Sequence, residues 1–204
     1  MNYFITAIGT DSGKTVVSAI LLEALKADYW KPIQSGSPTD RDTVKSMVSA
    51  NRKFHPEQFL LKTPASPHAA AKIDGISVSV RDLKIPETSN TLIIEGAGGL
   101  LVPLNDDELM IDCIRHFNAE VILVCNIYLG SINHSLLSLE ALKSRGIKIK
   151  GIIFNGEENI ETQNIIMKYA NVPCLLHIHK ENSITPEIIR KYAEKLKAEW
   201  PGVG

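Results

Sequence analysis

The sequence has little cysteine and no surplus of charge of either sign. Three cysteines among 204 residues, widely spaced and without a C-x-x-C pair, argue against a disulfide framework and against a zinc site. With 22 basic and 23 acidic side chains the formal net charge is −1, so no global field attracts nucleic acid or an anionic membrane. We expect a protein of the reducing cytoplasm that binds neither, with Cys125 and Cys174 buried in apolar, strand-like runs.

Long apolar runs and a basic amino terminus are also missing. No uninterrupted apolar stretch approaches the roughly 18 residues of a membrane span, and no basic region precedes an apolar one as in a secretory signal. The hydrophobic share of 44% is enough for one sizeable core. The chain length suits a single domain, which we expect over residues 1–204.

Short strand-like runs alternate with segments of helical period along most of the chain. "TLIIEG", "EVILVCN" and "KGIIFN" are short, β-branched and almost entirely apolar, as strands buried on both faces are. The alternation predicts an α/β fold, with a mostly parallel central sheet and helices on both faces. The expected strands are Tyr3–Ile8, Tyr29–Ile33, Thr91–Glu95, Val121–Asn126, Ile149–Asn155 and Val172–His177. The expected helices are Gly13–Ala27, Arg41–Ala50, Met110–Phe117, Ile132–Ser144, Ile160–Tyr169 and Thr185–Glu199, and the proline-bearing stretch Arg52–Asn90 is expected to be a long excursion with a few short elements.

A glycine-bearing turn joins the first expected strand to the first expected helix in "AIGTDSGKTVV". It ends in Gly13-Lys14-Thr15 like the phosphate-binding loop G-x-x-x-x-G-K-[ST], but Ile8 occupies the place of the first glycine. A helix that begins here aims backbone N–H groups and its positive end at one point, which attracts phosphate. Lys14 would reach the terminal phosphates, and Thr15 would ligate Mg²⁺. The missing glycine predicts that the turn finds its backbone freedom at Gly9.

Two further strand ends carry polar residues. "YWKPIQSG" places Lys31 and Ser35 after one strand, and "TLIIEGAGGLLVPL" ends another in Glu95. Because the carboxyl ends of parallel strands face the ligand crevice, we expect Lys14, Lys31 and Glu95 to converge. A carboxylate that ends so apolar a run is costly to bury unless it is paired or bound to a metal.

Mg²⁺ on a triphosphate takes a hydroxyl and one or two carboxylates from the protein. Thr15 and Glu95 supply two ligands, and Asp42 in "TDRDTVKSM" is the candidate third. Asp40 in the same segment is an equally good helix N-cap, and capping or solvent exposure remains an open role for Asp42.

The ordered set "GTDSGKT", "WKPIQSG", "SPH", "EGAGGLLVPL", "LGSINH" and "GIIFN" resembles the dethiobiotin synthetases, and the resemblance extends from Tyr3 to at least Asn155. It implies a P-loop NTPase-like fold and a cytoplasmic, homodimeric ligase of biotin biosynthesis that uses ATP and Mg²⁺. The implied substrates are 7,8-diaminononanoate and CO₂. A carbamate and then a carbamic-phosphoric anhydride would lead to dethiobiotin, ADP and phosphate, the penultimate step of the pathway.

The same resemblance implies roles for individual residues. Lys14 and Lys31 would be catalytic, and the metal ligands would be Thr15, Asp42 and Glu95. The implied nucleotide-binding residues are Thr10, Asp11, Ser12, Gly13, Lys14, Thr15 and Asn155, of which Asn155 reads adenine. The implied substrate-binding residues are Thr10, Lys31, Ser35, Gly98, Ser131, Ile132 and Asn133. The last three begin a helix that in this family belongs to the neighbouring subunit and binds the substrate carboxylate, so activity implies a homodimer.

Three other interpretations fit parts of the pattern. An amidotransferase-type synthetase, such as those of cobyric acid synthesis, has a similar loop but carries a glutaminase domain for which this length leaves no room. A partitioning or septum-site ATPase, which is a nucleotide-switched binding protein, is expected to have an additional lysine early in the loop, where Ala7, Ile8 and Gly9 stand. A non-catalytic nucleotide-binding scaffold does not require Lys31 and Glu95 beside the loop lysine.

Overall fold

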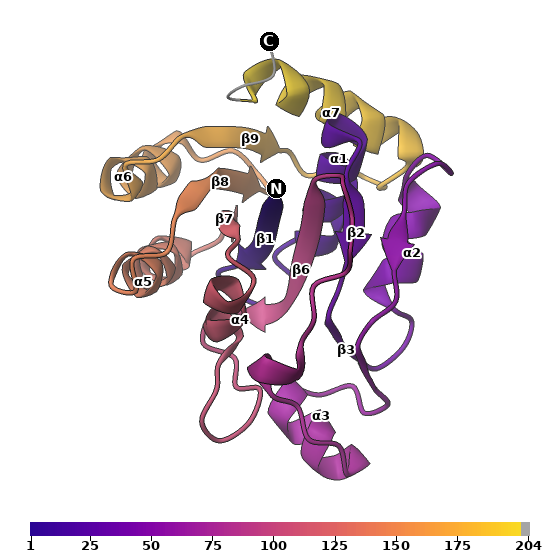
Figure 1. Ribbon diagram of the computed structural model, residues 1–204. Coiled ribbons are helices and arrows are strands. Elements are labelled where there is room, and N and C mark those ends of the chain that lie inside the picture. The colour runs from indigo at the N-terminus through magenta and orange to yellow at the C-terminus, as the bar shows by residue number, and fades with distance from the viewer. Residues whose placement is uncertain (201–204) are drawn as a thin grey trace.

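Seven parallel strands form the central sheet of the computed structural model, which describes residues 1–200 (Figure 1). In spatial order they are β4 (Phe54–His55), β2 (Asp28–Trp30), β6 (Leu92–Gly99), β1 (Asn2–Ala7), β7 (Glu120–Asn126), β8 (Ile149–Asn155) and β9 (Cys174–Ile178). Every neighbouring pair in this order is parallel. The expected sheet is therefore confirmed, and the carboxyl ends of its strands share one edge.

Helices cover both faces of the sheet, as expected. On one face lie α1 (Lys14–Leu25) and α7 (Pro186–Glu199), with α2 (Asp40–Met47) packed against both, and on the other lie α4 (Met110–His116), α5 (Ser131–Lys143) and α6 (Ile160–Ala170) (Figure 1). Adjacent residues of β1 serve the two faces, because Ile5 belongs to the core under α1 and α7 whereas Phe4 belongs to the opposite core. This alternation is what a strand buried on both sides requires.

The expected strand Tyr29–Ile33 is divided between two sheets. β2 ends at Trp30, and β3 (Ile33–Ser35) pairs instead with β5 (Phe59–Leu61) in a separate two-stranded parallel sheet. Pro32 lies between them and has no N–H to continue the ladder.

The excursion after α2 contains short elements, as predicted. Besides β4 and β5 these are α3 (Pro67–Asp74) and the 3₁₀ turn η1 (Val80–Asp82). The small sheet and α3 lie beyond the carboxyl ends of the central strands (Figure 1). The excursion thus supplies one wall of the region where the site residues gather.

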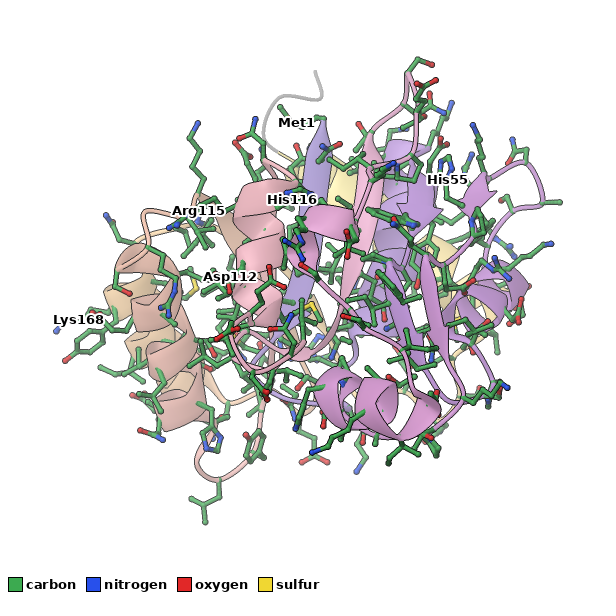
Figure 2. All side chains as sticks on the ribbon, turned by 60° about the horizontal axis from the view of Figure 1, so that its bottom comes forward. Met1, His55, Asp112, Arg115, His116 and Lys168 are labelled. Carbon is green, nitrogen blue, oxygen red and sulfur yellow. The ribbon has the colours of Figure 1, made fainter. Side chains whose placement is uncertain are left out.

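The amino ends of the strands lie on the other side of the molecule, where Met1 is found away from α3 (Figure 2). Within residues 1–200 no helix has both the length and the apolar character needed to cross a bilayer. All three cysteines are free thiols, and Cys125 is buried as expected. Cys174 is exposed, contrary to expectation, because it is the first residue of the edge strand β9.

Candidate active site

The loop between β1 and α1 departs from the consensus pattern in a way that the geometry explains. The backbone N–H of Ile8 donates to the carbonyl of Val124 at 3.1 Å, and its side chain packs against the core. Ile8 therefore continues the strand pairing, which needs no glycine. The positive φ angles of the turn belong to Asp11 (56°) and Gly13 (97°), not to Gly9. The expectation for Gly9 is wrong, because the chain turns later than the consensus spacing suggests.

The second half of the loop is braced from the end of β8. The side-chain amide of Asn155 donates to the carbonyl of Ser12 at 3.0 Å, and the Ser12 hydroxyl donates to the carbonyl of Gly9 at 3.0 Å. A Cβ at Gly13 would collide with the Asn155 amide, so both the positive φ and this close approach require glycine there. Asn155, for which the family resemblance implies a contact with adenine, thus holds the phosphate loop in this structure.

Lys14 begins α1 and lies almost entirely inside the protein. Its side chain folds back so that Nζ lies 3.4 Å from the carbonyl of Gly9. Burial lowers the pKa of Lys14, and the nearby carboxylate of Glu95 opposes that shift. A buried ammonium whose one hydrogen bond within residues 1–200 goes to a carbonyl gains strongly from a phosphate oxygen, which brings negative charge to it.

Lys31 follows β2 and forms the centre of a buried ionic cluster. Its Nζ lies 2.5 Å from Oδ2 of Asp40 and 3.2 Å from Oε1 of Glu95, and only 4% of Lys31 is exposed. Burial by itself lowers the pKa of Lys31, but Glu95 and Asp40 more than offset burial, so that the pKa is raised. The two carboxylates therefore favour the charged form of Lys31 at the carboxyl edge of the sheet.

Asp40, rather than Asp42, faces this cluster. Thr39 is the N-cap of α2: its hydroxyl accepts from the N–H of Asp42 at 3.1 Å and donates to Oδ2 of Asp42 at 2.7 Å. Asp42 is thereby engaged at the helix end, while Asp40 turns toward Lys31 and Thr15. Residues two apart on a helix point to nearly opposite sides, so only one of these carboxylates can face the pocket. The placement favours Asp40 over Asp42, the choice made from the sequence, as a candidate metal ligand.

The oxygen atoms around Thr15 fit a magnesium ion. Oγ1 of Thr15 lies 3.1 Å from Oε1 of Glu95 and 3.4 Å from Oδ1 of Asp40. Adjacent ligands of an octahedral Mg²⁺ ion with bonds of 2.0–2.1 Å lie about 3 Å apart, and Mg²⁺ prefers oxygen donors. Within the described part of the chain no three His, Cys, Asp or Glu side chains group so as to hold a metal. A cation here would therefore depend on the hydroxyl and on phosphate oxygens as well as the two carboxylates.

Two hydroxyl groups behind Glu95 were missed by the sequence analysis. Ser18 on α1 donates to Oε2 of Glu95 at 2.8 Å, and Tyr29 on β2 donates to the same oxygen at 3.0 Å. Burial and then the charge of Glu95 raise the pKa of Tyr29 well above its usual value, so the phenol stays protonated and donates. Helical spacing offered a weak signal for Ser18, which lies one turn beyond Lys14.

A hollow of about 630 Å³ opens in front of this cluster. Among the predicted residues it is lined by Thr10, Asp11, Lys14, Lys31, Ser35 and Gly98, to which the structure adds Gln34, Asp40 and residues 64–67 from the excursion. Thr15 and Glu95 lie behind the lining, in contact with Asp40 and Lys31. The hydroxyl of Ser35 is buried and has no hydrogen-bond partner within residues 1–200. An unpaired buried hydroxyl at such a wall is a ready contact for a ligand.

Ser131, Ile132 and Asn133 begin α5 and do not line the 630 Å³ hollow. The Ser131 hydroxyl is buried without a partner in the described residues. Large apolar side chains are exposed around this helix start: Leu101 (54%), Tyr128 (43%), Leu129 (103%), Ile132 (37%) and Leu137 (60%). A smaller, mainly apolar hollow of about 420 Å³ runs between the phosphate loop and α5.

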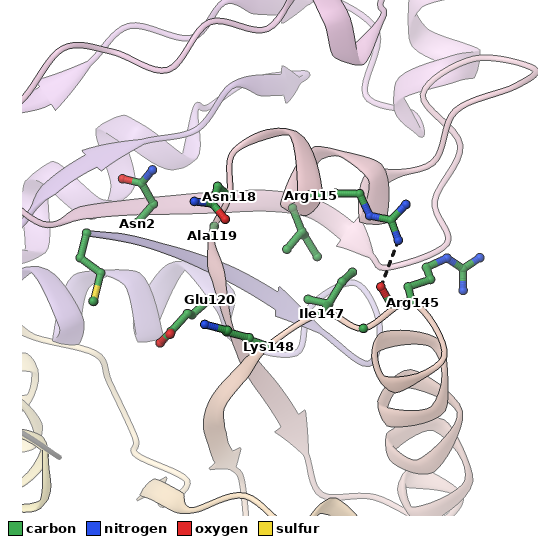
Figure 3. Close-up of a pocket in the computed structure, with 11 residues that line it drawn as sticks. Asn2, Arg115, Asn118, Ala119, Glu120, Arg145, Ile147 and Lys148 are labelled. Carbon is green, nitrogen blue, oxygen red and sulfur yellow. Dashed lines mark hydrogen bonds between the residues drawn. The ribbon is translucent and has the colours of Figure 1, made fainter.

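Another hollow, of about 530 Å³, lies at the opposite edge of the sheet (Figure 3). Its lining includes Arg115, Arg145, Lys148 and Glu120, and the Arg115 guanidinium donates to the carbonyl of Arg145 at 3.0 Å. None of the predicted site residues lines it. Since ligands of open α/β sheets bind outside the carboxyl ends of the strands, the 630 Å³ hollow is the candidate active site.

Comparisons with known proteins find relatives over almost the whole chain. A family model described as an AAA domain matches residues 1–188. The ATP-dependent dethiobiotin synthetase of Cytophaga hutchinsonii is 53% identical over 201 residues, covering 97% of this chain and 98% of that protein. The ATP-dependent dethiobiotin synthetase of Christiangramia forsetii is 52% identical over 199 residues, covering 96% of each chain.

Solved structures share the fold at low sequence identity. A putative plasmid partition protein from Borrelia burgdorferi bound to AMPPNP has a TM-score of 0.60 at 10% identity, covering 97% of this chain and 96% of that one. The cell division ATPase MinD of Pyrococcus furiosus has a TM-score of 0.57 at 15% identity, covering 97% and 98%. These likenesses establish a P-loop NTPase fold and nothing about the reaction.

Proposed function

The chain belongs to the family of ATP-dependent dethiobiotin synthetases, ligases of the biotin pathway, and on that premise we propose that it converts 7,8-diaminononanoate, CO₂ and ATP to dethiobiotin, ADP and phosphate. One amine of the diamine is carboxylated to a carbamate, whose oxygen attacks the γ-phosphate of ATP. The resulting carbamic-phosphoric anhydride is closed by the second amine to the cyclic urea. Residues 1–204 act as one catalytic domain in the cytoplasm, a location that the three free thiols support.

The observation that carries this proposal is the approach of two buried lysines to one hollow from different elements. Lys14 comes from the phosphate loop, whereas Lys31 comes from the end of β2 and is held by two carboxylates. A protein that only binds nucleotide needs a cation on the phosphates. A phosphoryl transfer also needs positive charge beside the attacking group and the transferring oxygens, because catalysis here is mostly positioning and charge neutralisation.

The two lysines divide this work. Lys14 bridges the terminal phosphates and the carbamate, and Lys31 holds the carbamate against the γ-phosphate. Thr15, Asp40 and Glu95 would hold a bound Mg²⁺ ion, which neutralises charge on the phosphate oxygens. Asp40 takes this role in place of Asp42, because Asp40 is the carboxylate that faces Thr15.

The walls of the hollow provide the remaining contacts. The loop from Thr10 to Thr15 binds the phosphates through its backbone N–H groups, and the free groups of the Asn155 amide read the adenine. Thr10, Ser35 and Gly98 contact the diamine or its carbamate. The unpartnered hydroxyl of Ser35 supports this assignment, since a bound polar group would satisfy it.

The substrate carboxylate is bound by a second copy of the chain. Ser131, Ile132 and Asn133 of the partner subunit present free N–H groups at the start of α5, which attract an anion. The exposed apolar side chains around this helix start support a homodimer, because several large apolar side chains exposed near one helix start are typical of an interface.

The activity is tested with purified protein, ATP, Mg²⁺, bicarbonate and 7,8-diaminononanoate. We expect phosphate release that depends on the diamine, with dethiobiotin identified by mass spectrometry. Phosphate release that is the same with and without the diamine, at saturating concentrations, would overturn the assignment.

The shared site is tested by mixing two inactive variants. Lys31→Ala disables the phosphoryl-transfer side, and Asn133→Asp repels the substrate carboxylate. If each site takes Lys31 from one subunit and Asn133 from the other, one of the two sites in a mixed dimer has both wild-type residues. Random exchange of subunits then makes about a quarter of all sites wild type. Restored turnover in the mixture, together with a dimer mass in solution, supports the proposal. An active monomer, or a mixture that stays inactive although subunits exchange, contradicts it.

A further inference from the structure

The two carboxylate oxygens of Glu95 have different surroundings. Oε1 lies 3.1 Å from the Thr15 hydroxyl and 3.2 Å from Nζ of Lys31. Oε2 instead accepts the hydroxyl groups of Ser18 and Tyr29 at 2.8 Å and 3.0 Å. One oxygen is thus directed at the reacting side of the site, and the other is held from within the protein.

The two hydroxyl donors do not reach the hollow. Ser18 and Tyr29 are both 0% exposed, and neither lines the 630 Å³ hollow in front of Lys31. They come from two elements, α1 and β2, that also carry Thr15 and lead to Lys31. Their hydroxyl groups are linked to the site through Glu95, to which both donate.

The orientation of Glu95 is not secured by its own bonds, because the terminal torsion of a glutamate side chain is broad. Without donors on Oε2, the carboxylate is free to rotate and offer both oxygens to the ammonium of Lys31, which lies only 3.2 Å from it. Charge-assisted hydrogen bonds from two fixed hydroxyls remove that freedom. Groups that orient a metal ligand in this way commonly contribute about 10–100-fold to metal affinity.

We propose that Ser18 and Tyr29 are positioning residues that hold the Glu95 carboxylate with Oε1 aimed at Thr15 and at the magnesium ion. The inference rests on the metal-binding part of the proposed function. It assigns to these two residues no contact with nucleotide, diamine or carbamate. It also explains why the carboxylate is buried among hydroxyl groups rather than left at the surface of the hollow.

The test compares Tyr29→Phe and Ser18→Ala with a matched control, Tyr3→Phe. Tyr3 is also a buried tyrosine of the sheet, in the same core as Tyr29, but its hydroxyl contacts Met1 at the other end of the sheet. Mn²⁺ binding in the presence of ATP is measured by the loss of the free-ion electron paramagnetic resonance signal. ATP binding in the presence of EDTA is measured by calorimetry, and thermal stability is recorded for each variant.

We expect Tyr29→Phe and Ser18→Ala each to weaken Mn²⁺ binding by about tenfold, with metal-free ATP binding unchanged. Tyr3→Phe is expected to leave both unchanged. If Tyr29→Phe does not fold, Ser18→Ala decides the question by the same measurements. Wild-type Mn²⁺ affinity in the folded variants, or an equal loss of metal-free ATP binding, overturns the inference, since the hydroxyls would then serve only stability or the general shape of the pocket.

Glu95→Gln separates this inference from the function on which it rests. If Glu95→Gln abolishes Mn²⁺ binding while the hydroxyl variants bind normally, only the positioning role fails. If Glu95→Gln binds Mn²⁺ like the wild type, the metal assignment of Glu95 and the positioning role fail together. The diamine-dependent assay is unaffected by either result and tests the reaction on its own.

Discussion

Two buried carboxylates on neighbouring strands have different uses: Glu95 lies in the middle of β6, and Asp28 lies at the amino end of β2. Both are nearly inaccessible, at 1% and 2% exposure. Asp28 accepts the Thr88 hydroxyl at 2.6 Å and the Asn90 amide at 2.9 Å. Glu95 instead accepts the Ser18 and Tyr29 hydroxyls on one oxygen. Its other oxygen accepts the Thr15 hydroxyl and the ammonium of Lys31.

The difference shows that a buried carboxylate with hydrogen-bond donors on its oxygens is not by itself evidence of a functional site. Both oxygens of Asp28 are used to fasten the segment before β6 to the sheet. Burial raises the pKa of Asp28, but the hydrogen bonds from Thr88 and Asn90, together with the neighbouring His55 ring, more than offset it, so that the pKa is lowered. Glu95 keeps one oxygen beside a hollow, a hydroxyl and a second carboxylate, which is the arrangement that a metal ion and phosphate can complete.

The largest effect is expected at Lys31, the lysine whose ammonium contacts Glu95. Asp28 contacts no lysine within residues 1–200. Lys31→Ala removes the charge that faces the transferring phosphoryl group, and turnover is expected to fall by about 10³-fold or more, while nucleotide still binds. Phosphate release and calorimetric ATP binding measure the two properties. Lys148→Ala, at the hollow on the opposite edge, is the matched control and should turn over normally. Wild-type turnover in Lys31→Ala would remove Lys31 from the mechanism.

Replacing each carboxylate by its amide tests the comparison directly. Glu95→Gln is expected to lower kcat/KM by about 100-fold in a protein that remains folded. Asp28→Asn should keep kcat but lose about 1.5–3 kcal/mol of stability, because an amide cannot accept all the donors that the carboxylate does. Steady-state kinetics and urea unfolding give the two numbers. The reverse pattern, with activity lost in Asp28→Asn at full stability, would abolish the distinction.

A smaller effect separates the two carboxylates of α2. Asp40→Asn is expected to raise the Mg²⁺ concentration for half-maximal activity by about tenfold, because Asp40 faces Thr15. Asp42→Asn should leave that concentration unchanged and lower stability by about 1 kcal/mol through the weakened capping interaction with Thr39. A magnesium titration of each variant distinguishes them. A shift confined to Asp42→Asn would restore the assignment made from the sequence.

The smallest effect is the acid dependence of stability. Because the pKa of Asp28 is lower in the folded state, its contribution is fully present above the unfolded pKa of about 3.9 and is lost as the pH falls through the folded pKa. The wild type should therefore lose more stability than Asp28→Asn on acidification below about pH 5. Urea unfolding at a series of pH values measures this. Parallel curves for the two proteins would show that the hydrogen bonds of Asp28 do not favour its charged form.

Much of the architecture follows from local pattern. Period and apolar runs predict the parallel sheet and the helices on its two faces, with bounds that differ from the structure by a few residues. Strand ends that share one edge also explain why Lys14, Lys31 and Glu95 come together as the sequence indicated. The division of the second strand was missed, because Pro32 interrupts the ladder inside the short segment Tyr29–Ile33, which was expected to form one strand.

The sequence by itself determined which elements form and which chemical groups stand at their ends, because those properties depend on residues close together in the chain. Only the tertiary structure decided that Asp40 and not Asp42 faces the cluster, that Gly13 and Asp11 rather than Gly9 carry the turn, and that Ser18 and Tyr29 hold Glu95. Those outcomes depend on the rotation of one helix and on contacts between residues far apart in sequence. The spacing of apolar residues along the chain reveals neither, since it specifies which face of an element is buried but not which partner that face meets.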